Sequence, residues 1–190
     1  SVGGYEVYGK GCGNFPQANC TVKPARTGGP GDPFEWTEFG MTGLSDVATL
    51  RSIMNESELM PTGKAAVWAW HKADGNPFVS WQATHFYREV FLPKDDSTDF
   101  ASIEQEVKAS QWLQAEGYRY AYQASRRRKW HRSAMVAWAY NEPWPNAVHQ
   151  SLVDYRGRSK HAYHWVKASL GMLDVSLEYY ALTVAADGTT

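Results

Sequence analysis

The sequence is short of cysteine, of net charge and of long apolar runs, and each shortage excludes a class of protein. Only two of its 190 residues are cysteines, and no His/Cys cluster has the spacing of a zinc site. Cys12 and Cys20 flank a short loop, where they either form a disulfide or remain thiols. The net charge of −1 gives no overall field that attracts nucleic acid or an anionic membrane. Apolar runs such as 65–70 are far shorter than the roughly 20 residues of a membrane-spanning helix.

Aromatic residues are abundant instead. The chain holds nine Trp and eleven Tyr, more than the core of an ordinary domain needs. Apolar residues make up 43% of the sequence, which excludes an intrinsically disordered chain. The length fits one domain, but a complete (β/α)8 barrel needs roughly 250 residues. The first residues lack the charged start and apolar core of a signal peptide, and the cellular compartment stays open.

Short apolar strands alternate with helical patterns, which is typical of parallel βα units. Residues 1–33 are loop-like because Gly and Pro concentrate there. Ser45 is the expected N-cap of the first helix, and the longest helix has the clearest amphipathic spacing. The sequence predicts strands over 34–41 and 133–140, helices over 46–54, 64–73, 81–91, 98–130 and 159–170, and an alternating strand over 175–190.

A basic cluster, 126–132, follows the longest predicted helix. Such a cluster can bind nucleic acid, or it can be a solvated set of cations that complements the dipole at a helix C-terminus. The near-zero net charge of the chain favours the second interpretation.

Carboxylates follow both predicted strands. Glu38 lies at the end of the first strand, and Asn141 and Glu142 come directly after the second. In parallel α/β barrels the carboxyl ends of the strands carry the catalytic groups. Glu38 can instead pair with an arginine or cap the next helix. Trp144, held between two prolines, can cover the face of a sugar ring or pack between barrel and loop.

Two carboxylates at strand ends, together with many aromatic residues, indicate glycoside hydrolysis. Retaining enzymes of this class use one carboxylate as nucleophile and a second as acid/base. Glu142 does not fit the acid/base role, because the nucleophile would have to follow several βα units later. The single glutamate after Glu142 is Glu178, in the alternating tail.

Three motifs in order resemble glycoside hydrolase family 2, in its β-mannosidase and exo-β-glucosaminidase-like branch. The run W-x-Y-N-E-P-W-P-N-A…S-L-V-D-Y-R-G-R-S-K-H-A-Y-H-W-V-K (138–167) resembles the eighth-strand segment of that family. The stretch T-E-F-G-M (37–41) is similar to its seventh-strand motif S-E-[FY]-G-[FM]. The helix over 111–121 resembles the one between those strands. The resemblance covers roughly 34–170.

The resemblance implies an α/β fold: the C-terminal portion of a (β/α)8 TIM barrel, followed by the start of a β-sandwich-like domain. Residues 1–170 would then supply about strands 7 and 8 with their helices, and 171–190 a linker and the first strand of the next domain. It also implies that Glu38 is the nucleophile of a retaining β-glycosidase, with no cofactor and no metal.

The same resemblance suggests residues that contact the sugar. Trp144 becomes a wall of the subsite for the non-reducing sugar, and Asn141 and Glu142 shape that pocket. Glu142 either binds a hydroxyl or orients its loop. Trp138 lies in the barrel floor or in the subsite. His71 either bonds to sugar or satisfies a main-chain carbonyl.

The chain also departs from the family pattern. Thr37 and Ser159 replace the usual Ser and Pro, which are mild changes. More seriously, no Asn-Glu precedes Glu38, so the acid/base is expected from sequence outside this chain, on the missing N-terminal barrel segment. The expected partners are therefore a β-glycoside and that segment. Two alternatives stay open: a non-catalytic carbohydrate-binding protein or degenerate homologue, and a fragment that only completes another chain.

Overall fold

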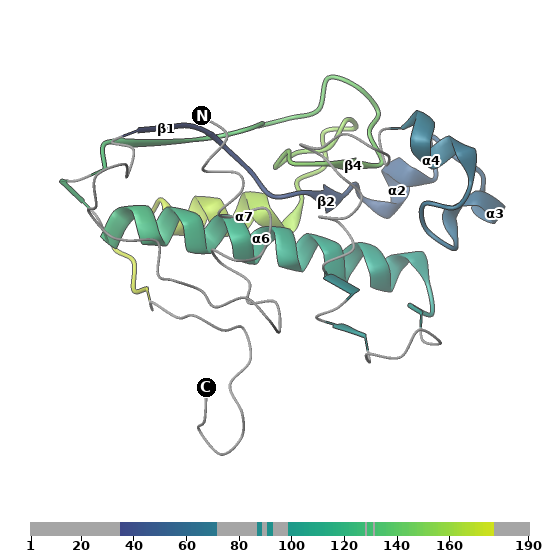
Figure 1. Cartoon of the computed structure of the whole chain (residues 1–190), viewed down its shortest axis with the longest axis horizontal. Helices are drawn as coiled ribbons and strands as arrows, with labels where there is room; N and C mark the ends of the chain where they lie inside the picture. Colours follow the sequence, from purple (N-terminus) through teal and green to yellow (C-terminus); the bar gives the residue numbers. More distant parts are fainter. Residues whose placement is uncertain are drawn as a thin grey trace, which may run out of the picture.

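Two parallel strands separated in sequence by a long helix form a sheet that lies along one side of that helix (Figure 1). The structure is a computed structural model. The part of the chain that it describes comprises residues 35–71, 87–88, 91–92, 99–127, 129–130 and 132–176.

Strand β1 (Glu35–Phe39) pairs in parallel with β3 (Ala134–Ala137). The register places Phe39 beside Ala137, and the main-chain N–H of Trp138 donates to the Phe39 carbonyl at 2.8 Å. Parallel strands need a long crossover, and α6 (Ile103–Arg127) lies within it. The predicted first strand and longest helix are thereby confirmed.

Helix α6 packs between the sheet and the last helix, α7 (His161–Ser169), which lies beside it in Figure 1. On the sheet side, the Phe39 ring lies 5.4 Å from Tyr118 and 5.2 Å from Tyr122. The helix carries acidic residues in its first turn and arginines in its last, as the macrodipole favours. The order β1, α6, β3, α7 therefore comprises two consecutive βα units.

The second strand is shorter than predicted. Its expected span was 133–140, but β3 ends at Ala137. Beyond that point the carbonyl of Tyr140 accepts from the N–H groups of Leu152 and Val153, at 3.1 and 2.9 Å. The main chain after β3 therefore bonds to a later loop, and residues 138–140 no longer belong to the sheet.

The predicted cap of the first helix is wrong. The helix α2 is short (Val47–Leu50), and its N-cap is Asp46, whose carboxylate accepts from the Ala48 N–H at 2.9 Å. Ser45 is buried instead, and its hydroxyl donates to the Asn146 carbonyl at 2.8 Å. The Ser45 hydroxyl therefore bonds to a residue that is distant in the sequence and does not cap the helix.

The remaining elements are short and flank the central βα units. A second sheet pairs β2 with β4 in antiparallel order. The bounds are Gly43–Leu44 for β2, Val148–His149 for β4, Glu56–Leu59 for α3 and Ala66–Trp70 for α4. Most of the predicted helix 81–91, both cysteines and the predicted strand 175–190 from residue 177 onward lie outside the described residues.

The β1–β3 sheet is covered by helices on one face. Met135 and Ala137 pack against the core, whereas Val136, which points the other way, is 53% exposed. In a complete barrel the face opposite the helices would be interior. The described residues form two-stranded sheets and no closed barrel, so the barrel itself remains an expectation.

Candidate functional site

The ends of β1 and β3 meet where the sequence predicted the chemistry. Glu38 lies in β1 directly before Phe39, and Trp138 follows β3. The side chain of Glu38 lies outside the described part of the structure, so its role as nucleophile stays a prediction. Gly40 is required here, because a Cβ at this position would lie 2.6 Å from the Trp138 carbonyl oxygen.

Exposed aromatic side chains follow β3. Trp138 is 54% exposed, Tyr140 61% and Trp144 45%. We call residues 138–146 the aromatic loop. Large aromatic faces left in solvent on one loop are typical of a surface that binds a ligand or a partner. The polar side chain of Asn141 is also exposed on this loop, and its main chain bridges to Val153.

A buried ion pair fixes the centre of the aromatic loop. The ammonium of Lys160 lies 2.9 Å from the Glu142 carboxylate, and both side chains are fully buried. Lys160 also donates to the carbonyls of Gly43 and His149, both at 3.2 Å. One side chain thus joins the aromatic loop to β2 and β4.

Two hydroxyls complete the surroundings of Glu142. Ser151 donates to one carboxylate oxygen, and the Ser45 hydroxyl, which donates to the Asn146 carbonyl at 2.8 Å, lies 3.4 Å from the other. The buried Glu142 carboxylate thus has both a cation and a hydroxyl donor as partners, as a polar group in the core requires. Of the two roles left open for Glu142, this geometry corresponds to orienting the loop.

His71 is tied to the same loop. It is buried, and its Nδ1 lies 2.7 Å from the Pro145 carbonyl oxygen. Its own carbonyl accepts from the Ala147 N–H at 2.9 Å. The contact corresponds to the alternative in which His71 satisfies a main-chain carbonyl. Asn146 closes the loop by donating from its side chain to the Trp144 carbonyl at 3.1 Å.

Sequence reasoning missed Lys160, Ser151, Ser45 and His149 as parts of this site. Lys160 and Ser151 lie in the segment that resembles family 2, so the resemblance already drew attention to the part of the sequence that contains them. No local pattern indicated that they would meet Glu142, because the contacts join residues on different loops.

His149 sits beside this ion pair as a neutral imidazole. Burial, and then the charge of Lys160, lower the pKa of His149 to about 4, while Glu142 opposes the shift. The ring Nδ1 accepts from the Ser151 N–H at 3.1 Å, which a ring protonated at that nitrogen cannot do.

The low pKa of His149 predicts a pH-dependent stability. The unfolded chain takes up this proton near pH 6.5 and the folded chain only near pH 4, so stability falls as the pH drops through that window. Between pH 7.5 and pH 5 we expect this group to remove about 2 kcal/mol of unfolding free energy, measured by urea denaturation. His149→Asn keeps an acceptor near Nδ1 and is expected to flatten the profile. His164→Asn, at an exposed position of α7, should change the profile much less, through the loss of its charge beside His161. Equal profiles for wild type and His149→Asn would contradict the assignment.

No helix among the described residues is long and apolar enough to cross a bilayer. Within the same residues, no three or more His, Cys, Asp or Glu side chains gather as metal ligands would.

The fold is similar to that of a solved enzyme. The crystal structure of a β-D-mannosidase from Dictyoglomus thermophilum matches with a TM-score of 0.56 and 22% sequence identity, over 70% of this chain and 15% of that chain. Over the matched part, the two share a fold. This chain therefore spans only a small share of that mannosidase's length. No family model matches the chain, and no curated protein does.

Proposed function

We propose that this chain is the C-terminal barrel segment of a retaining, β-mannosidase-like glycosidase of family 2. The observation that carries the proposal is that the E-F-G segment and Trp138, the first residue of the aromatic loop, lie side by side at the ends of two adjacent parallel strands. These are the positions from which barrel enzymes act on their substrates. The shared fold with a β-D-mannosidase supports the same proposal.

In the proposed reaction Glu38 is the nucleophile. Its carboxylate attacks the anomeric carbon and forms a glycosyl ester, while the bond to the leaving oxygen breaks. An acid/base carboxyl group from sequence outside this chain donates a proton to that oxygen. The same group then takes a proton from water, which attacks the anomeric carbon, releases the sugar and frees Glu38.

The aromatic loop supplies the proposed sugar subsite. Trp144 and Trp138 expose ring faces that can cover the apolar face of a pyranose, and Asn141 offers an exposed amide for a hydroxyl. Glu142 and His71 act indirectly in this proposal. Glu142 holds the loop through its ion pair with Lys160, and His71 through its contact with the Pro145 carbonyl. The branch resemblance favours a β-mannoside or β-glucosaminide.

A second function, carbohydrate binding without hydrolysis, has its own support. The exposed aromatic side chains would bind sugar whether or not Glu38 reacts. A degenerate homologue would keep the aromatic loop and lose the chemistry.

Trapping the covalent intermediate separates these two functions. A 2-deoxy-2-fluoro-β-mannosyl fluoride slows release of the glycosyl-enzyme, because the fluorine destabilises the oxocarbenium-like transition state. In the enzyme completed by its upstream segment we expect a mass increase of one fluorosugar, located by peptide mass spectrometry on Glu38. Saturable sugar binding without any label would favour the binding module, and a label on another carboxylate would refute the assignment of Glu38.

A further inference from the structure

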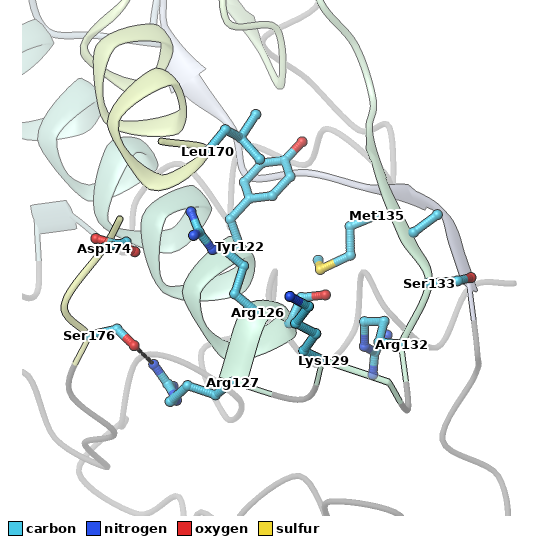
Figure 2. Close-up of a pocket in the computed structure, with 12 residues that line it drawn as sticks. Tyr122, Arg126, Arg127, Lys129, Arg132, Ser133, Met135, Leu170, Asp174 and Ser176 are labelled. Carbon is cyan, nitrogen blue, oxygen red and sulfur yellow. Dashed lines mark hydrogen bonds between the residues drawn. The ribbon is translucent and has the colours of Figure 1, made fainter. Parts of the chain in front are cut away.

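A pocket of about 510 Å³ lies at the opposite end of β3 from the aromatic loop (Figure 2). Its walls are the last turn of α6, the first residues of β3 and the segment 170–176 that follows α7. The volume lies within the range of roughly 300–1,000 Å³ typical of small-molecule sites. The pocket shares no residue with the proposed glycosidase site and does not depend on that function.

The walls of the pocket are strongly cationic. Asp174 is the single acidic residue among the lining residues. The cationic residues that line it are Arg126, Arg127, Lys129 and Arg132. A chain with a net charge of −1 has therefore concentrated positive charge in one concave place.

Neutral groups hold the arginines in place. Arg126 donates to the carbonyl of Gly171, at 2.6 Å, and to that of Ser169, both at the end of α7. Arg127 donates to the Ser176 hydroxyl at 3.0 Å, the contact dashed in Figure 2. These bonds orient each guanidinium without cancelling its charge.

The lysine and the acid of the pocket also have neutral neighbours. The Lys129 ammonium lies 4.8 Å from the centre of the Trp130 ring, and Asp174 accepts from the side-chain amide of Gln123 at 3.1 Å. Within the described residues, Arg126, Arg127 and Lys129 form no ion pair with a carboxylate. Among the described residues, no carboxylate therefore neutralises the charges of these three residues.

We propose that this pocket binds the phosphate group of a small molecule. Guanidinium groups match the planar, two-point geometry of phosphate oxygens, and an ammonium adds a point charge. Asp174 offers an acceptor for a hydroxyl on the body of the ligand. Nucleic acid fits less well, because the cations line a concavity on a chain without overall positive charge.

Calorimetric titration of the whole chain with three probes tests the proposal. Glucose 6-phosphate is expected to bind, and glucose is not. Inorganic phosphate shows whether the site takes the free ion or a phosphate ester. If it binds as tightly as glucose 6-phosphate, the site is one for the free ion; if it binds more weakly, the site is one for an ester. Absence of binding by both phosphates up to about 10 mM would overturn the proposal, as would equal binding of glucose and its phosphate.

Charge-removing variants locate the binding. Arg127→Gln and Lys129→Gln lie at exposed positions and should fold normally, as circular dichroism can verify. Each is expected to weaken phosphate binding about tenfold. Arg156→Gln, on an exposed turn outside the pocket, is the matched control and should leave affinity unchanged. Equal losses in all three variants, or tighter binding of duplex DNA with the same sensitivity to them, would overturn the proposal.

Discussion

Glu38→Gln is expected to abolish hydrolysis of a β-mannoside or β-glucosaminide by the enzyme completed with its upstream segment. The amide has almost the shape of the carboxylate but cannot form the glycosyl ester, so the two-step retaining reaction cannot begin. Removing a nucleophile from a catalytic unit typically costs at least about 10⁴-fold in kcat. Release of an aryl leaving group, followed by absorbance, measures the loss. An undiminished rate would refute the assignment.

Glu35→Gln is the matched control for this prediction. The same chemical change is made on the same strand, at an exposed carboxylate that accepts from the Ser133 hydroxyl at 3.2 Å. We expect activity to be retained within a few-fold of wild type, because Glu35 lies at the opposite end of β1 from the proposed chemistry.

A further variant separates a lost nucleophile from a distorted fold. In Glu38→Gly, added azide can occupy the space of the missing carboxylate and attack the anomeric carbon from the same face. The expected product is a glycosyl azide with an inverted anomeric configuration, detectable by NMR. Failure of azide to restore any turnover, together with a wild-type circular dichroism spectrum, would count against Glu38 as the nucleophile.

Lys160→Met is expected to produce the largest loss of stability in the described structure. The substitution keeps a long apolar side chain but leaves the Glu142 carboxylate buried without its cation. It also removes the donor to the carbonyls of Gly43 and His149. Breaking a buried pair by removing one partner costs about 3–5 kcal/mol, which urea denaturation followed by tryptophan fluorescence can measure.

Two variants test whether the uncompensated charge causes that loss. Lys167→Met makes the same substitution at an exposed position of α7, where about 0.5 kcal/mol or less is expected. The double variant Lys160→Met/Glu142→Leu removes both charges and should regain much of the stability lost in the single variant. If the double variant were as unstable as Lys160→Met, the cost would come from packing and not from charge.

The ion pair connects stability to the proposed function. The exposed rings belong to a loop that Glu142 and the Pro145 carbonyl attach to the core. A sugar-binding surface of aromatic side chains is effective when the rings are held before the ligand arrives. Loosening the loop should therefore weaken sugar binding along with stability.

The sequence predicted the central elements well, because each carries its own local signal. The 3.6-residue spacing of apolar positions identified α6, a short aromatic-rich stretch with a glycine at its end identified β1, and a short apolar run bounded by polar residues identified β3. The errors fall at element ends. Ser45 is of a residue type that favours the N-cap, yet Asp46 is the N-cap, because the Ser45 hydroxyl donates to the Asn146 carbonyl instead.

By itself, the sequence determined the order of β1, α6, β3 and α7, the glycine after β1 and the aromatic composition of the loop after β3, since periodicity and local motifs encode these features. The short elements β2, β4 and α3 were not predicted. Only the tertiary structure decided what Glu142 contacts. Its cation stands eighteen positions later on another loop, and the hydroxyl of Ser45 arrives from before α2. Such contacts depend on the path of the chain in space. Burial then requires that each polar group find a partner wherever the fold places one.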